Sequence, residues 1–397
     1  MIRYREVVVV AAIMCAFNNG RPTLAQSTST TISVLDYGAD PTGGSDSTAA
    51  FNSWWTACNT ETSSKALCSI PSGTYAFSSD LNFDFSGNTA GGVVVQGAGE
   101  NKTLLQFAEG KHLSIINSST ILGGSTFYGT FSNFGVLANF STGPALQLGQ
   151  TNFSDALNGF AFRDIWVRNA ANVSGSEGIE LNEVYSSAFS NITAGDGCTN
   201  IYGDCPTSGD ALLLTQSSFN TFQGSFSQAR NGVRLAQGYN FGNVFTSLDL
   251  EVDEYDLVID NAQSTHNTFI GGQFAYVGNA VYASAGSGNI VEHANIVGST
   301  GSAGPIVGSA VGLTIKGVYN LVSTPAFPSS GTVTQNTTGR DLLINLYNLT
   351  SPTICYGPAA VTCITPGSSA SILFRNGDSI QITSPMGGGG WVWTELY

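Results

Sequence analysis

The sequence predicts an all-β fold in which short strands stack as the successive coils of a solenoid. One fragment, an asparagine followed two residues later by an aromatic or apolar residue, recurs at spacings of 23, 24 and 22 residues. Its four copies are Asn220–Phe222, Asn243–Phe245, Asn267–Phe269 and Asn289–Val291. A fixed period of this length without a helical pattern is typical of β-solenoids. The 48 glycines and the low charged content of 10% also suit a β protein with many tight turns.

Residues 32–51 predict a cap in front of the first coil. An extended apolar segment runs into a Gly/Asp/Pro turn, and either Ser45 or Asp46 is then placed to cap a short helix. The helix carries Trp54 and Trp55, which we expect to pack within the cap.

Three further segments follow this cap in order: residues 70–75, an apolar strand over residues 93–95, and the glycine-containing turn at residues 96–99. The ordered set resembles the amino-terminal cap and first coils of the pectate-lyase-like superfamily of right-handed parallel β-helices. That superfamily includes polygalacturonases, exo-glucanases and phage tailspike depolymerases. The resemblance implies a right-handed parallel β-helix with an N-terminal helix cap, and carbohydrate as the first substrate class to consider.

The two ends of the chain predict segments outside the β-helix. Arg3 and Arg5 precede a short apolar run, which indicates a signal peptide over residues 1–25 and a secreted, extracellular or periplasmic protein. The run is too short for a membrane span, so we expect no membrane association. The β-helix domain with its cap is expected over residues 26–330, and a small C-terminal β domain over residues 331–397. Its predicted strands are Leu342–Leu346, Ser371–Phe374, Ser379–Ile382 and Trp391–Trp393.

The charge balance restricts the partners. The formal net charge of −14 disfavours nucleic acid. It also argues against a strongly anionic polysaccharide, unless calcium or a local basic patch intervenes. Because tailspike-like relatives are commonly trimers, the resemblance makes a homo-oligomer, such as a trimer, an expectation.

Six cysteines remain after the signal peptide, and they fall into neighbouring pairs. These pairs are Cys58 with Cys68, Cys198 with Cys205, and Cys355 with Cys363. Three local disulfides are the natural interpretation in an oxidising compartment, although six cysteines permit about 15 connectivities. A zinc site is disfavoured because the sequence has no C-x-x-C and its three histidines, His112, His266 and His293, are isolated.

The coil that starts near Gly178 is roughly ten residues longer than its neighbours. The extra residues include Asp196 and Asp210 and the cysteine pair between them, so this coil is predicted to carry a disulfide-pinned loop. Loops added to a rigid solenoid are common places for function. Asp210 is therefore a candidate substrate-binding residue.

A candidate catalytic row follows from aligning the second strands of the coils on one inward position. The residues taken as equivalent are Ile192, Phe226, Leu250 and Phe274. Four residues further along, the alignment brings Asp196, Arg230 and Glu254 into a row. Coils stack about 4.8 Å apart, so the two carboxyls would lie on the order of 10 Å apart with Arg230 between them. We interpret Asp196 and Glu254 as a general acid and base, and Arg230 as a substrate-binding residue.

The strand before Glu254 is the most acidic part of the chain. Asp249, Glu251 and Asp253 alternate with apolar residues, which predicts three carboxylates on one outward face. Glu251 or Asp253 would replace Glu254 as catalytic residue if the register slips, and Asp249 would contact substrate. The aromatic side chains of Tyr255 and Tyr276 are candidate stacking faces for sugar rings. The same carboxylates are equally interpreted as solvated or structural charge, or as a calcium site.

Three functional hypotheses follow. The first is a secreted glycoside hydrolase that uses paired carboxylates in a groove along the β-helix, without a cofactor, on a neutral or weakly charged polysaccharide. The second is a polysaccharide lyase acting on a uronate polymer, with Arg230, Arg234, Tyr276 and calcium as its machinery. The third is a carbohydrate-binding or structural β-helix without catalysis.

Overall fold

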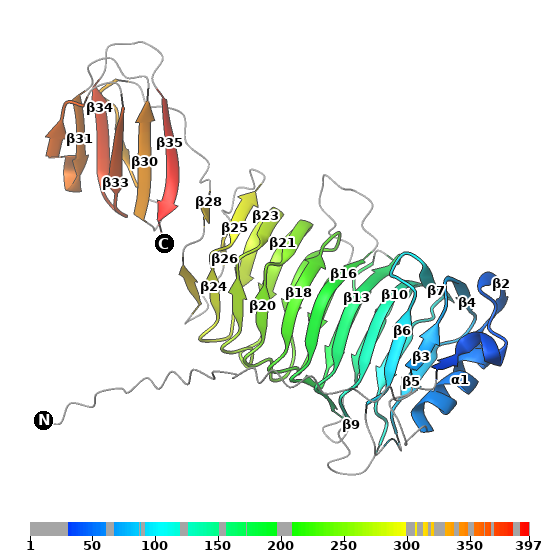
Figure 1. Ribbon diagram of the computed structural model, residues 1–397. Coiled ribbons are helices and arrows are strands. Elements are labelled where there is room, and N and C mark those ends of the chain that lie inside the picture. The colour runs from blue at the N-terminus through cyan, green and yellow to red at the C-terminus, as the bar shows by residue number, and fades with distance from the viewer. Residues whose placement is uncertain are drawn as a thin grey trace, which may run out of the picture.

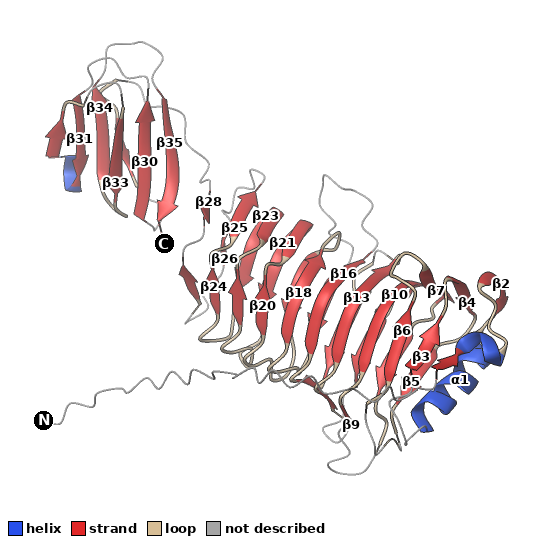
Figure 2. Ribbon diagram, viewed as in Figure 1, coloured by secondary structure: helices blue, strands red, loops and turns tan. Residues whose placement is uncertain are grey.

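The computed structural model shows a right-handed parallel β-helix preceded by a helical cap and followed by a small antiparallel β unit (Figure 1). It describes residues 31–60, 67–86, 88, 92–119, 126–150, 156–171, 173–196, 209–298, 306–307, 313–316, 319–320, 330–336, 341–347, 353–360, 362–366, 369–383 and 390–396. The proposed signal peptide and the Cys198–Cys205 pair lie outside the described residues. Strands dominate the β-helix, and the long helix lies at one end of it (Figure 2).

The cap covers the first coil as the sequence predicts. It consists of β1 (Thr31–Ser33), the 3-10 helix η1 (Val34–Tyr37), β2 (Thr42–Asp46) and α1 (Thr48–Thr60). Of the predicted pair, Asp46 contacts the first turn of the helix, because its carboxylate accepts hydrogen bonds from the main chain and hydroxyl of Thr48 at 3.1 and 2.6 Å. The N-cap position itself is Ser47, since its carbonyl accepts a hydrogen bond from the N–H of Phe51. Trp54 and Trp55 are buried, and their indole N–H groups donate to the carbonyls of Ile32 and Asp84.

Each coil of the β-helix contributes strands to three parallel faces. Strands of the first face are β1, β3 (Leu67–Ile70), β6 (Val94–Gly97), β10 (Thr130–Asn139), β13 (Ala161–Asn169), β16 (Ala188–Asp196), β18 (Thr221–Phe226), β20 (Val244–Thr246), β22 (Thr268–Ile270), β24 (Ile290–Glu292) and β27 (Thr314–Lys316). The predicted coil at residues 160–167 is confirmed by β13.

The second face starts with β2 and includes the later halves of β10, β13, β16 and β18. Two of its strands, β21 (Asp249–Ile259) and β23 (Gln273–Ala283), bend around a corner and continue into the third face. Its other strands are β4 (Gly73–Phe77), β7 (Thr103–Glu109), β25 (Asn295–Gly298) and β28 (Tyr319–Asn320).

The third face carries the candidate site. It comprises β5 (Leu81–Asp84), β8 (Leu113–Ile116), β11 (Pro144–Gly149), β14 (Glu177–Asn182), β17 (Asp210–Leu214), β19 (Asn231–Leu235), the second halves of β21 and β23, and β26 (Ile306–Val307). A short separate sheet joins β9 (Thr126–Phe127), β12 (Leu157–Asn158) and β15 (Val184–Tyr185).

The recurring asparagines form a buried ladder at the turn between the third and first faces. The main-chain N–H and the side-chain amide of Asn220 both donate to Oδ1 of Asn243, at 3.0 and 3.2 Å. Asn243 donates in the same way to Asn267, and Asn267 to Asn289. Each amide also donates to a main-chain carbonyl, as Asn243 does to Ser217 at 2.8 Å. The ladder satisfies polar groups that a buried turn would otherwise leave unpaired.

The phenylalanines of the first three repeats form a stack directly inside the first face with two phenylalanines of earlier coils, and Val291 takes this position in the fourth repeat. Successive rings lie 4.8, 4.6, 4.6 and 4.3 Å apart and are within 11° of parallel. The stack runs through Phe162, Phe189, Phe222, Phe245 and Phe269. One three-residue fragment therefore specifies both the turn and the core of a coil.

The C-terminal strands form two antiparallel sheets around their own apolar cluster. One contains β29 (Val333–Gln335), β34 (Ser379–Thr383), β31 (Thr353–Gly357) and β32 (Thr362–Ile364), with the 3-10 helix η2 (Pro358–Ala360) between the last two. The other contains β33 (Ala370–Phe374), β30 (Asp341–Tyr347) and β35 (Gly390–Leu396). The four predicted strands are confirmed, while the domain limits at 25 and 330 stay predictions.

Two of the three expected disulfides are present, Cys58–Cys68 and Cys355–Cys363. The first ties α1 of the cap to β3 of the first face, and the second joins the paired strands β31 and β32. Among the described residues, no helix is long and apolar enough to cross a membrane.

We expect Asn243→Ala to lower the free energy of unfolding by about 2–4 kcal/mol, because it breaks two rungs of the ladder and leaves buried groups unpaired. Urea unfolding followed by circular dichroism measures the change. Asn82→Ala, at an exposed position of β5, is the matched control and should change stability by less than about 0.5 kcal/mol. Equal effects of the two variants would contradict a stabilising role for the ladder.

Candidate functional site

A cavity of about 430 Å³ opens on the outer side of the third face. Acidic and basic side chains from successive coils line it, with two amides and a few small or apolar residues. The lining residues are Glu177, Asp210, Leu213, Thr215, Arg234, Ala236, Gln237, Asp260 and Asn261. The strand register brings lining residues of different coils together. Leu213 on β17 and Arg234 on β19 lie side by side in one outward row, which Glu180 on β14 and Val258 on β21 continue on either side.

Asp210 is a buried carboxyl at the start of β17, with 3% of its surface exposed. The side-chain amide of Asn231, its register partner on β19, donates to its Oδ1 at 2.5 Å. Burial raises the pKa of Asp210 above its ordinary value of 3.8, and the charge of Asp260 adds to the rise. The hydrogen bond from Asn231 and the charge of Arg234 oppose the shift. The net rise favours a protonated carboxyl.

Arg234 links Asp210 to a second carboxylate. Its Nη1 lies 3.7 Å from Asp210, and its Nη2 lies 2.6 Å from Oδ2 of Asp260. The Nε–H donates to the same oxygen of Asp260 at 3.0 Å. Although burial lowers the pKa of Arg234, the two carboxylates raise it overall. The guanidinium therefore remains charged, and it forms a much tighter ion pair with Asp260 than with Asp210.

Glu180 adds a further carboxyl on β14, next to the cavity. Burial raises its pKa, a hydrogen bond from the Thr215 hydroxyl at 3.3 Å opposes the rise, and the charge of Asp210 reinforces it. The site thus holds two carboxyls that burial keeps closer to neutrality, Glu180 and Asp210, and one in a short ion pair, Asp260. Carboxyls in such different environments suit acid–base chemistry.

A second charged pair stands at the corner between the second and third faces. Arg230 donates through Nε to Glu254 at 3.1 Å, as the predicted row requires for these two residues. The charge of Arg230 also acts on the carboxyl of Asp210, which places the pair beside the cavity. Burial, followed by the charge of Glu254, raises the pKa of Tyr255, whose ring lies 5.7 Å from that of Tyr282.

The predicted position of Asp196 in this row is wrong. The predicted register position is shared by Phe226, Leu250 and Phe274. Ile192 does not share it, because Phe226 pairs with Ala194 and Ile192 pairs with Gly224. The cause is a bulge at Asn191, which has a positive φ of 52° and interrupts the pairing of β16 with β18. Asp196 therefore ends β16 two residues out of line with Arg230.

The prediction that Asp253 shares an outward face with Asp249 and Glu251 is also wrong. Asp249 and Glu251 lie on the outer side of the second face, where Glu251 accepts a hydrogen bond from Gln273 at 2.5 Å. The pairing of β21 with β23 is then interrupted on both sides of Asp253. This corner turns Asp253 fully into the interior, so it is unavailable to substrate. Tyr276 is the register partner of Asp253 on β23.

Sequence reasoning missed Glu180 and Asp260 and named Arg234 only as a cation for a lyase. The sequence does contain a pattern that marks Glu180 and Arg234. Strands of the third face carry one outward residue directly before their last apolar residue. In β14 and β19 that residue is Glu180 and Arg234. Asp260 gave no such signal, since it directly follows β21.

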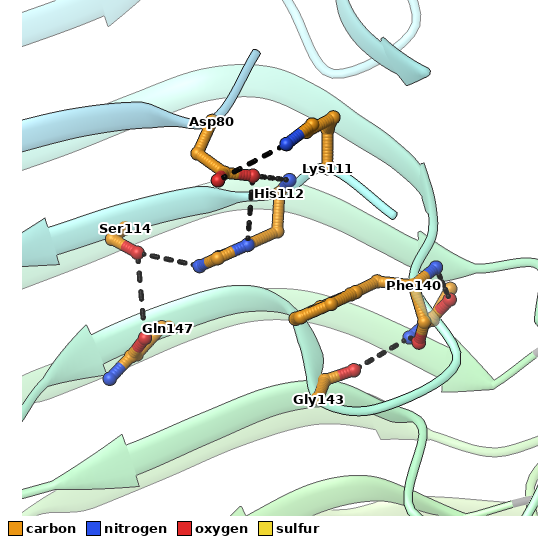
Figure 3. A network of polar contacts seen from close by, with 8 residues as sticks. Asp80, Lys111, His112, Ser114, Phe140, Gly143 and Gln147 are labelled. Carbon is orange, nitrogen blue, oxygen red and sulfur yellow. Dashed lines mark hydrogen bonds and ion pairs between the residues drawn. The ribbon is translucent and has the colours of Figure 1, made fainter. Parts of the chain in front are cut away.

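A polar cluster around His112 lies on another part of the third face (Figure 3). The Ser114 hydroxyl is 2.9 Å from Nε2 of His112, and Nδ1 lies 3.3 Å from Asp80, which also pairs with Lys111 at 3.7 Å. This is the order of groups in a Ser-His-Asp triad. However, Ser114 is only 3% exposed and Phe140 stacks on the imidazole at 4.8 Å. Unlike Asp210, which lines the cavity despite its burial, Ser114 and His112 do not line it, and Phe140 covers the imidazole, so we interpret the cluster as coil packing.

No group of three or more His, Cys, Asp or Glu side chains within the described part of the chain is arranged to hold a metal ion. The carboxyls and the guanidinium of the cavity are suited to moving protons and to binding hydroxyl groups.

The family model described as "Rhamnogalacturonase A/epimerase, pectate lyase-like" matches residues 31–241. No curated protein sequence matches the chain.

Several solved structures resemble the chain at low identity. A mannuronan C-5 epimerase A-module from Azotobacter vinelandii is 14% identical, with a TM-score of 0.38, and the match covers 72% of this chain and 96% of that one. Tailspike protein 4 of bacteriophage CBA120 is 12% identical, with a TM-score of 0.49, covering 92% and 65%. A family 28 exopolygalacturonase from Yersinia enterocolitica is 10% identical, with a TM-score of 0.37, covering 73% and 66%.

The raised pKa of Asp210 predicts a pH-dependent effect of Asp210→Asn on stability. A buried carboxyl with a raised pKa destabilises the fold as pH rises from 3.8 through the folded-state pKa, because the unfolded chain ionises first. Asp210→Asn should therefore become more stable relative to wild type as pH rises over this window. Urea unfolding at several pH values measures the difference.

Asp46→Asn provides the control of opposite sign. Hydrogen bonds, first from Thr48 and then from Ser78, hold the pKa of Asp46 well below 3.8. Wild type should thus hold an advantage over Asp46→Asn at neutral pH, and that advantage should shrink as pH falls below 3.8. The same pH trend in both variants would contradict the assignment for Asp210.

Proposed function

The chain belongs to the rhamnogalacturonase A/epimerase, pectate lyase-like family, and from this premise we propose that it is a carbohydrate-active enzyme that hydrolyses glycosidic bonds in the cavity of the third face. The observation that carries the proposal is the placement of Asp210 and Asp260 on the two sides of Arg234. Glycoside hydrolysis uses one carboxyl as proton donor and a second as base or nucleophile, and the raised pKa of Asp210 and the ion pair of Asp260 with Arg234 support these two roles.

The two carboxyls have separate roles in this mechanism. Asp210, with its raised pKa, donates a proton to the oxygen of the leaving sugar. Asp260, paired with Arg234, acts as the carboxylate that activates water or attacks the anomeric carbon. Because both contact one guanidinium, their oxygens are at most about 9 Å apart. That is the scale of glycosidase carboxyl pairs, about 5 Å in retaining and roughly 6.5–9.5 Å in inverting enzymes.

The charges around the cavity favour a neutral or weakly charged polysaccharide. Arg234 and Arg230 are each already paired with carboxylates, Asp260 and Glu254. A uronate polymer would have to compete for these cations on a chain with a net charge of −14. The Tyr255 and Tyr282 rings beside the Arg230–Glu254 pair offer apolar faces on which sugar rings can stack.

We propose that the protein acts outside the cytoplasm. The two disulfides Cys58–Cys68 and Cys355–Cys363 support an oxidising compartment, and residues 1–25 have the features of a secretory signal. Sequencing of the N-terminus of protein recovered from the culture medium tests this proposal. Recovery of the chain in the cytoplasm with residue 1 intact would contradict it.

The activity is tested by incubating the purified protein with a panel of neutral and uronate polysaccharides. New reducing ends without the ultraviolet absorbance of unsaturated uronates are expected. Asp210→Asn and Asp260→Asn should each lower the rate by about 100-fold or more, because each removes one partner of the acid–base pair. Glu109→Gln, an exposed carboxylate-to-amide change at the end of β7, should leave the rate unchanged.

Other outcomes would identify the alternatives. Absorbance from unsaturated products would establish a lyase. Inversion at a uronate carbon without chain cleavage would establish an epimerase. Binding of a polysaccharide without any product would establish a carbohydrate-binding solenoid, and each of these results would overturn the hydrolase.

A further inference from the structure

Two aspartates of β21, Asp253 and Asp256, lie completely inside the β-helix, where their surfaces are 0% exposed. Oδ1 of Asp253 accepts a hydrogen bond from the main-chain N–H of Ala229 at 3.0 Å. The other oxygen of Asp253 and both oxygens of Asp256 have no hydrogen-bond partner. Three buried carboxyl oxygens without a donor are costly, because transfer from water to the protein interior removes their hydration.

The charges around the pair make the cost higher. Burial is the main cause that raises the pKa of both groups, and the neighbouring carboxylates of Asp249 and Glu251 raise it further. Among the ion pairs of described residues, none involves Asp253 or Asp256. A cation at this position would compensate the charge of both carboxylates.

Main-chain oxygens converge on the same position. Around the point where a Cβ of Gly232 would stand, Oδ2 of Asp253 lies at 2.7 Å, the carbonyl oxygen of Asp256 at 2.8 Å and that of Phe226 at 2.9 Å. These three oxygens are consequently within about 6 Å of one another, a separation that one cation with oxygen ligands at about 2.3–2.6 Å spans with small adjustments.

The strand register leaves room for the Asp256 side chain. Its partners in the coils on either side are Gly232 and Ala280, which have at most one side-chain carbon. A larger residue at either position would occupy the space beside the carboxyl. Gly232 and Ala280 thus leave space for the carboxyl of Asp256 in an otherwise apolar interior.

We propose that Asp253 and Asp256, with the carbonyl oxygens of Phe226 and Asp256, bind one calcium ion inside the β-helix. The named donors are all oxygens, which is the ligand type that calcium prefers, and a divalent ion neutralises two carboxylates completely. Magnesium fits less well because it requires near-octahedral geometry and retains water molecules. The ion joins the coil of β19 to the coil of β21, directly behind the Arg230–Glu254 corner.

Calcium binding is tested with the full chain, purified and treated with EDTA. Equilibrium dialysis against calcium chloride, followed by atomic absorption, should give one calcium per chain. Calcium should also raise the melting temperature relative to EDTA, by roughly 2–4 °C at saturating concentration. The double variant Asp253→Asn/Asp256→Asn should bind no calcium and melt at one temperature in both conditions.

The matched control is Asp249→Asn/Glu251→Gln, which removes two carboxylates from the outer side of the same strand. It should bind calcium with the stoichiometry of wild type. Loss of binding in this control with retention in Asp253→Asn/Asp256→Asn would move the site to the outer face and overturn the proposal. Wild type that binds no calcium and melts identically in calcium and EDTA would overturn it as well, and this arm stands even if the inner variant fails to fold.

Discussion

The asparagine ladder is the interaction on which the arrangement of the coils depends. Register decides which side chains face the interior, because a slip by one residue would turn every side chain of a strand to the opposite face. Each ladder amide binds the main chain and the next amide, so it positions one residue of every coil from Asn220 to Asn289. The phenylalanine two residues later is then placed on the stack below it.

This register produces the cavity. Asp210 and Arg234 lie on neighbouring coils of the third face, and Asp260 follows the strand of the next coil. Residues that are 24 and 26 positions apart in the chain thus come together, with Arg234 reaching a carboxylate on the coil to either side. The arginine between the acids limits their repulsion, and strands β17 and β19 hold Asp210 and Arg234 in place.

The sequence predicts the fold well because its signals are periodic. The repeated asparagine and aromatic residues mark the turns and the core, and the cap segment contains its own turn, helix cap and tryptophans. The candidate site is predicted only in part, because it depends on irregularities. One bulge at Asn191 displaces Asp196, and one corner around Asp253 reverses a side chain that simple alternation places outside. The Arg230–Glu254 contact was predictable because no bulge intervenes between these two coils at that position.

The unequal lengths of the coils have a consequence for how such a protein can change. Successive ladder asparagines are 23, 24 and 22 residues apart, yet their main-chain hydrogen bonds to the next amide are 3.0, 3.1 and 3.0 Å long. Differences in coil length are therefore absorbed at other positions, such as the turn after the third face, where Ile259 pairs with Ala283, 24 residues on, but Thr265 pairs with Ser287, 22 residues on. That turn contains Asp260 and Asn261, which line the cavity. Evolution can consequently lengthen or shorten the rim of the cavity, and so change the shape of the cavity, while the rest of the coil keeps its place.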